Sequence, residues 1–129
     1  AVTVANTSAP DRQRKIVKRV FFYFDVNSSE LTAQTSSKLD DLVSTIRFDN
    51  KWNIEIIGYA DNSGDADYNK MLSERRANSI SSYLRDSGIV IDKVSQEGRG
   101  AIIEGNTTED KKKSRRVEVI LRGVLDSNM

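Results

Sequence analysis

The most restrictive feature of this sequence is a short strand, a polar turn and a long helix that follow one another within residues 53–87. The apolar run from Asn53 to Tyr59 predicts a buried strand. The segment from Asp61 to Asp67 is rich in Asp, Asn and Gly, which predicts a turn. Asp67 can cap a helix that runs to about Ser87, and Gly88 predicts a left-handed stop. This unit therefore places polar side chains where a strand ends and a helix begins.

The rest of the chain continues the alternation of strands and helices. We predict a strand over Lys18 to Phe24, a helix from about Thr32 to Phe48, a short strand near Val94 to Glu97, a loop from Gly98 to Ser114 and a final strand over Arg116 to Arg122. The apolar residues of the first strand are continuous, which predicts burial on both faces and a central position in the sheet. The order of elements predicts an α/β fold, an α+β sandwich in which helices cover one face of a small mixed sheet.

The length of 129 residues is typical of one domain. Residues 1–17 begin with a small, polar stretch that contains the only proline, which predicts a flexible tether. The folded domain is expected to occupy 18–123, and residues 124–129 are expected to form a C-terminal tail. Hydrophobic residues make up 37% and charged residues 30% of the chain, as in a well-solvated globular protein.

Composition excludes several classes of function. The chain has neither Cys nor His, so it lacks thiol nucleophiles, imidazole or thiolate zinc ligands and the Ser-His type of triad. We expect no enzymatic activity, no metal site and no cofactor. Lys and Arg total 20 against 19 Asp and Glu, and the basic cluster at 111–116 has no interleaved aromatic residues, so nucleic-acid binding is not expected. No apolar run reaches the roughly 18–20 residues of a spanning helix, so membrane attachment is expected only through segments absent from this chain.

The long helix carries two polar residues on its apolar side. At about 100° per residue, Asn69 and Arg76 fall between Leu72 and Ile80 on the helical wheel, whereas Arg75 points away. A guanidinium among apolar side chains is costly unless an anion meets it.

Asp61, at the end of the preceding strand, is the local candidate for that anion. One interpretation is a structural Asp61–Arg76 salt bridge, with Asn69 holding the loop. The other is a binding site in which a ligand's ammonium meets Asp61 and its carboxylate meets Arg76, since the planar guanidinium suits bidentate carboxylate binding. The residues alone leave both open.

A set of short segments occurs in order between about Val20 and Leu121. These segments are GYADNSG at 58–64, Asn69, LSERRA at 72–77, Tyr83-Leu84, Gly88-Ile89 and SRRVEV at 114–119. Together they resemble the OmpA-like C-terminal domain family, which includes the periplasmic ends of peptidoglycan-associated lipoproteins and flagellar stator proteins.

The resemblance implies a βαβαββ fold and a ligand, the meso-diaminopimelate of the peptidoglycan stem peptide. The free end of that residue carries an ammonium and a carboxylate on one carbon. By position, the family's ammonium-binding aspartate falls on Asp61 and its carboxylate-binding arginine on Arg76. Asn69 matches a family asparagine, the backbone near Leu72 closes the pocket, and Arg115 falls on the first member of an arginine pair.

Two departures from the family pattern concern the same region. In the family the arginine pair usually follows Asn, whereas Ser114 precedes it here. The segment from Arg99 to Lys113 is the least family-like part of the chain.

The resemblance implies a non-enzymatic protein that binds peptidoglycan and anchors an envelope protein or assembly to the cell wall. The expected location is the periplasm of a Gram-negative bacterium, with a tether to the outer or inner membrane in the full-length protein. The alternative is a protein-interaction module on the same fold, with a weak or vestigial pocket and with envelope or secretion-system proteins as partners.

Overall fold

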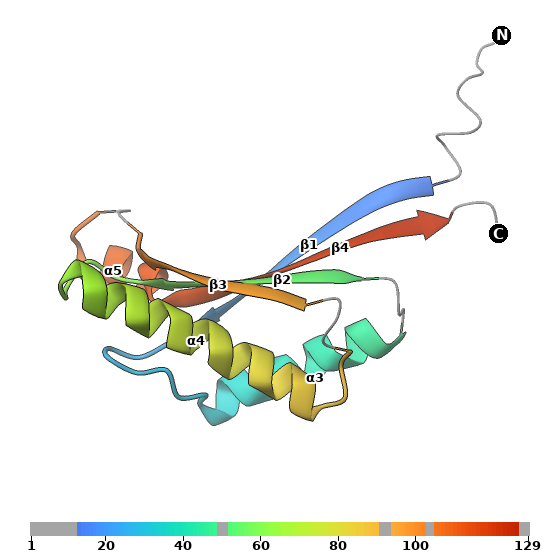
Figure 1. Ribbon diagram of the computed structural model, residues 1–129, viewed down its shortest axis with the longest axis horizontal. Coiled ribbons are helices and arrows are strands. Elements are labelled where there is room, and N and C mark those ends of the chain that lie inside the picture. Colours follow the sequence, from blue (N-terminus) through green and yellow to red (C-terminus); the bar gives the residue numbers. More distant parts are fainter. Residues whose placement is uncertain (1–12, 49–51, 91–93, 103–104, 127–129) are drawn as a thin grey trace, which may run out of the picture.

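The computed structural model describes residues 13–48, 52–90, 94–102 and 105–126. Figure 1 shows one sheet with two long helices along the same face and a short helix at one end. In chain order the elements are β1 (Gln13–Tyr23), α3 (Ala33–Phe48), β2 (Asn53–Ala60), α4 (Ala66–Asp86), β3 (Val94–Ala101), α5 (Thr108–Ser114) and β4 (Arg116–Asp126). The predicted α/β fold is confirmed, and α5 is an addition to it.

The sheet is mixed, with the strand order β1-β4-β2-β3. β4 pairs antiparallel with both β1 and β2, and β2 pairs parallel with β3. A parallel pair needs a crossover connection, and α4 supplies it between β2 and β3. The two central strands are therefore β2 and β4, and the loop after β2 opens directly onto the start of α4.

The prediction that the first strand is central is wrong, because β1 lies at an edge and pairs only with β4. Its side chains alternate: Phe22 is buried and Tyr23 is 49% exposed. Phe21 is partly covered by the Arg116 guanidinium, 5.9 Å from the ring centre. One side of the apolar run in β1 therefore faces the core through Phe22, and on the other side Arg116 partly covers Phe21.

The strands also extend beyond the predicted limits of 18–123. β1 and β4 pair from Tyr23↔Arg116 out to Gln13↔Asp126, so residues 13–17 belong to the sheet rather than to a tether. Residues 1–12 and 127–129, where the rest of the predicted tether and tail falls, lie outside the described residues.

The predicted loop from Gly98 to Ser114 is also wrong, because it holds the end of β3 and all of α5. A Cβ on Gly98 would stand 2.4 Å from the backbone nitrogen of Glu74, so this glycine permits close packing of α4 rather than marking a turn. α5 begins with a capping box in which Thr107 and Asp110 bond to each other's backbone N–H groups. The end of β3 and helix α5 contain few apolar residues, so the hydrophobic pattern did not predict them.

Helix α4 begins two residues earlier than expected. Its cap is Asp65, whose side chain accepts from the Tyr68 backbone N–H at 2.8 Å, and not Asp67. Gly88 follows the helix with φ +90°, which confirms the predicted left-handed stop.

The main core lies between the sheet and the two long helices. It contains the buried residues Phe22, Phe24, Leu39, Leu42, Val43, Ile46, Trp52, Ile54, Ile56, Ala77, Ile80, Leu84, Ile89, Val117, Val119 and Leu121. This packing fixes α4 on β2, which sets the position of every polar side chain at the start of the helix.

We predict that Gly58→Ala destabilises the protein by about 1–3 kcal/mol, the usual range for overpacking. A Cβ at Gly58 would lie 1.9 Å from the Ser73 carbonyl oxygen, so β2 and α4 must separate. Urea unfolding measures the effect. The exposed Ser95→Ala on β3 is the control, and equal stability of Gly58→Ala and wild type would contradict the prediction.

Candidate functional site

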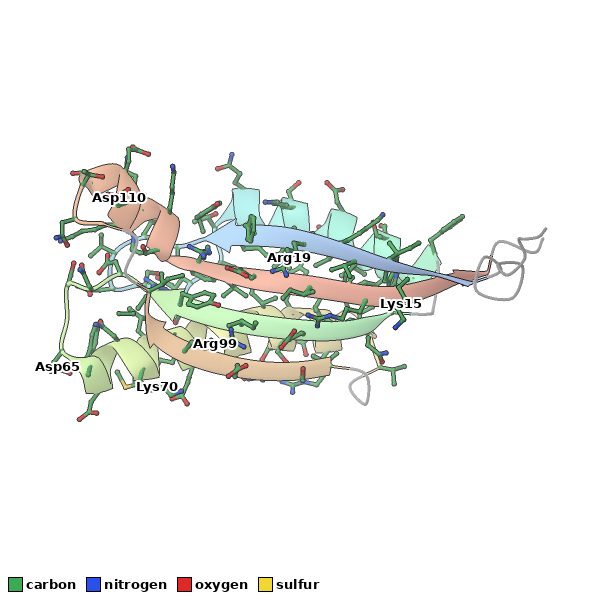
Figure 2. All side chains as sticks on the ribbon, turned by 90° about the horizontal axis from the view of Figure 1, so that it is seen from above. Lys15, Arg19, Asp65, Lys70, Arg99 and Asp110 are labelled. Carbon is green, nitrogen blue, oxygen red and sulfur yellow. The ribbon has the colours of Figure 1, made fainter. Side chains whose placement is uncertain are left out.

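A small polar cavity lies where β2 ends and α4 begins. Figure 2 shows Asp65 at the start of α4 and Asp110 on α5 at this same end of the molecule. The polar cavity is lined by Asn27, Asp61, Ser63, Gly64, Tyr68, Asn69, Leu72, Arg76 and Arg115. Its volume of about 10 Å³ is close to the least that holds one water. All five side chains singled out in the sequence therefore meet in one place.

Asp61 follows the last residue of β2 and is only 8% exposed. Its Oδ1 accepts from the Ser63 N–H at 2.9 Å, and its Oδ2 accepts from Arg115 Nη1 at 3.3 Å. Burial alone would raise the pKa of Asp61, but the bonds from Ser63 and Arg115 outweigh it and hold the pKa below its usual 3.8. The carboxylate is therefore ionised at neutral pH and already has a cationic partner.

Arg115 reaches Asp61 because it joins α5 to β4. Its backbone N–H bonds to the Lys111 carbonyl at the end of α5, and its Nε donates to the Phe24 carbonyl at 3.0 Å. The residue before it, Ser114, is 2% exposed and donates its hydroxyl to Asp110. Ser114, in place of the usual Asn, thus ends a helix of this chain, and Arg115 still reaches the cavity.

Arg76 has a fully buried side chain, at 0% exposure. Its Nε donates to the Ser28 carbonyl at 2.8 Å, its Nη1 to Tyr59 at 3.1 Å and its Nη2 to Asp25 at 2.9 Å. The guanidinium also lies 5.5 Å from the Phe24 ring centre. Burial lowers the pKa of Arg76 to about 10, against an opposing effect of the nearby Asp61, so the side chain remains charged at neutral pH.

The possible Asp61–Arg76 salt bridge is wrong as a direct contact, because no ion pair joins these two side chains within the described ranges. Asp61 pairs with Arg115, and Arg76 bonds to backbone carbonyls. Backbone carbonyl oxygens can accept the hydrogen bonds of a guanidinium, as a carboxylate can. Sequence patterns do not reveal where those carbonyls lie in the fold.

Helix α4 presents the polar residues as the wheel predicted. Asn69 is 5% exposed and donates its side-chain amide to the Gly64 carbonyl at 3.0 Å, so it holds the loop before the helix. Leu72 forms an apolar wall of the cavity, and Arg75 is exposed on the other side of the helix.

Four residues that line the cavity were not singled out in the sequence: Asn27, Ser63, Gly64 and Tyr68. Tyr68 donates its hydroxyl to the Asn27 side chain at 3.1 Å, which connects α4 to the turn after β1. Asn27 has φ +54°, a left-handed conformation that Asn tolerates. Ser63 binds Asp61 in an Asp-x-Ser turn, which is a readable local signal, whereas nothing local connects Asn27 to Tyr68.

The arrangement of charged side chains around the polar cavity can hold a charged ligand. Two guanidinium groups and one carboxylate face the same cavity, a set suited to a ligand with an ammonium and a carboxylate. Among the described residues, no cluster of three or more Asp, Glu, His or Cys side chains is placed to hold a metal ion. None of the helices in the described part of the chain is long and apolar enough to cross a membrane.

Comparison with known sequences identifies relatives over most of the chain. A model of the OmpA family matches residues 23–119. The chain is 34% identical to outer membrane protein A of Shigella flexneri over 141 residues, covering 98% of this chain and 40% of that protein. It is 33% identical to outer membrane protein A of Bordetella avium over 112 residues, covering 84% of this chain and 58% of that protein. The chain thus spans only part of the length of these relatives.

Solved structures share the fold. The peptidoglycan-associated lipoprotein of Burkholderia pseudomallei superposes with a TM-score of 0.74 at 22% identity, covering 81% of this chain and 90% of that one. The cell wall anchor of the type VI secretion system of Pseudomonas aeruginosa gives 0.71 at 20% identity, covering 89% and 90%. At these identities the likeness concerns the fold alone.

We predict that Arg76→Ala lowers the free energy of unfolding by about 3 kcal/mol, because three backbone carbonyls lose their buried donor. Arg75→Ala, an exposed neighbour, is the control and should change stability by less than about 0.5 kcal/mol. Denaturant unfolding of both variants is the measurement. Similar stabilities of the two variants would contradict the assigned role of Arg76.

We also predict that Asp61 contributes to acid sensitivity. Its folded pKa lies below 3.8, so its stabilising effect is present above that pH and is lost as pH falls through the folded pKa. Asp61→Asn should therefore be less stable than wild type near neutral pH, and the difference should shrink below about pH 3.8. Urea unfolding across this range tests it, and a difference independent of pH would count against the assignment.

Proposed function

We propose that this chain, which belongs to the OmpA family, binds peptidoglycan without cleaving it and so anchors an envelope protein or assembly to the cell wall. The observation that carries the proposal is the polar cavity, in which Asp61, Arg76 and Arg115 meet at the end of β2. Two solved proteins that share this fold are named a peptidoglycan-associated lipoprotein and a cell wall anchor, which agrees with this proposal. On this proposal the domain works in the periplasm, where the wall of a Gram-negative bacterium lies.

The ligand we propose is the free end of meso-diaminopimelate. Its ammonium would bind Asp61, and its carboxylate would meet the positive potential of Arg76 and Arg115. Each ionic hydrogen bond of this kind contributes roughly 1.5–3 kcal/mol. Asn69 would keep the loop in place, and Leu72 would close the cavity beside the aliphatic part of the ligand.

Binding requires the cavity to open. A volume of about 10 Å³ does not admit an amino-acid side chain, and the Arg115 guanidinium already occupies the side of Asp61 that the ligand's ammonium needs. The arginine is joined to Asp61 by one bond of 3.3 Å, which is at the long end for a charge-assisted bond. We propose that the ammonium replaces Arg115 on Asp61 as the ligand enters.

The second candidate is a protein-interaction module of an envelope or secretion complex. The closed state of the cavity favours it, because a permanent Asp61–Arg115 pair leaves no room for a ligand. The two functions differ in what Asp61 does, since only the first needs its carboxylate to be reached from outside.

We predict that the purified protein is retained by insoluble sacculi and that Asp61→Ala reduces the affinity by about ten- to a hundredfold. Arg75→Ala, an exposed change outside the polar cavity, should be retained like wild type. Unfolding curves for each variant show whether the folded fraction is comparable.

A matched ligand strengthens the experiment. Sacculi whose stem peptides carry L-lysine in place of meso-diaminopimelate keep the ammonium but lack the carboxylate, so retention on them should be weak. Equal retention on both kinds of sacculi would overturn diaminopimelate binding, and no retention on either kind would favour the protein-interaction module. Release of soluble fragments from sacculi by the pure protein would overturn the absence of cleavage.

A further inference from the structure

A wider groove lies beside the polar cavity, between the end of β1, the start of α3 and helix α5. Its volume of about 670 Å³ falls within the usual range for small-molecule sites, roughly 300–1,000 Å³. We call it the basic groove. Its walls are the strand segment 21–25, Lys38 of α3, and Lys112, Lys113 and Arg115 at the end of α5.

One side chain separates the basic groove from the polar cavity. Arg115 lines both spaces, and its side chain is 13% exposed. Its Nη1 bonds to Asp61 on the cavity side, and its Nε bonds to the Phe24 carbonyl on the groove side. If a ligand's ammonium takes Asp61, the Arg115 guanidinium is free to turn toward the groove. A ligand anchored in the cavity therefore continues into the basic groove.

The charges of the basic groove favour an anionic ligand. Four cationic side chains line it against two carboxylates, those of Asp25 and Glu109. The exposed Lys112 pairs with Glu109 at 3.6 Å. The ammonium of Lys113 makes no ion pair or hydrogen bond with any residue in the described ranges, so it can meet an incoming carboxylate without losing a partner.

The edge of β1 offers backbone groups to a peptide. Phe24 donates its N–H to the Arg115 carbonyl, so it faces β4. Hydrogen bonds alternate in direction along an antiparallel strand, which turns the backbone of Tyr23 and Phe21 toward the free edge. The Phe21 carbonyl accepts from Lys38, in agreement with this alternation. An extended peptide can bond to such an edge.

We propose that the basic groove binds the acidic part of the stem peptide next to the diaminopimelate, with Lys112 and Lys113 meeting the free α-carboxylate of its γ-linked D-glutamate. This inference rests on the proposed function, since the diaminopimelate must first occupy the polar cavity. It also gives Lys112 and Lys113, two residues of the basic cluster, a role in binding an anionic ligand other than nucleic acid. The groove, on this view, distinguishes stem peptides by their charge.

Three ligands separate the two sites in calorimetric titrations. Free meso-diaminopimelate reaches only the polar cavity. The tripeptide L-alanyl-γ-D-glutamyl-meso-diaminopimelate reaches both sites, and the same tripeptide with its α-carboxylate amidated keeps the shape but loses the charge. We expect the acidic tripeptide to bind about two- to tenfold more tightly than the amidated one, as two partly exposed ion pairs allow.

The double variant Lys112→Gln/Lys113→Gln should abolish this preference and leave the affinity for free meso-diaminopimelate unchanged. The matched control, Lys15→Gln/Lys111→Gln, loses the same charge outside the groove. Lys111 lies on α5 but does not line the groove, and Figure 2 places Lys15 far along the sheet from Asp110. The control should keep the preference.

The outcomes are distinguishable. Failure of free meso-diaminopimelate to bind would overturn the proposed function and this inference together. Binding of free meso-diaminopimelate with equal affinities for the two tripeptides would overturn the basic groove alone. An equal loss of preference in the control variant would also overturn it, because the effect would then come from net charge rather than from Lys112 and Lys113.

Discussion

The buried guanidinium of Arg76 connects three parts of the chain that are distant in sequence. It bonds to Asp25 and Ser28 in the turn after β1 and to Tyr59 near the end of β2, while its own backbone lies in α4. A buried charge without hydrogen bonds would be strongly destabilising, so these carbonyls cannot move away from it freely. The turn, the strand end and the helix start are therefore held in one arrangement, and the polar cavity is the space between them.

This role changes how the candidate site is to be understood. A fully bonded Arg76 acts mainly as a fixed positive charge behind the cavity, whereas Arg115 has one long bond to Asp61 and is the more movable of the two arginines. Asp61 lies between them, ionised and held by Ser63. On the proposed function, Arg76 is the rigid cation, Asp61 the held anion and Arg115 the cation that the ammonium of a zwitterionic ligand replaces. Because Arg76 holds three segments together, a substitution there changes protein stability and ligand binding at once. A substitution at Asp61 separates the two effects more easily.

Asp61, Asn69 and Arg76 could be predicted from residue patterns, because they lie on one continuous strand–turn–helix unit. Arg115 lies between α5 and β4 and was expected only from the family resemblance. The helical wheel placed Asn69 and Arg76 inward and Arg75 outward, and the structure agrees. Where elements far apart in sequence meet, the patterns were insufficient. The apolar run of β1 suggested a central strand, and the glycines and lysines of 98–114 suggested a loop. Their burial and pairing depend on Arg116, α4 and β4, which no local window includes.

Local patterns in the sequence determined the order of the four strands and the two long helices, the inward face of α4 and the left-handed stop at Gly88. These follow from backbone preferences and from the periodicity of hydrophobic residues, which act over a few neighbours. The grouping of Arg115 with Asp61 and Arg76 was implied only by the family resemblance. Only the tertiary structure decided which groups form the ion pairs and hydrogen bonds of the site. Asp61 meets Arg115 rather than Arg76, because the buried guanidinium is satisfied by carbonyl oxygens of two other segments. Every residue carries such an oxygen, so its choice as a partner depends on the folded backbone and is not encoded in residue type.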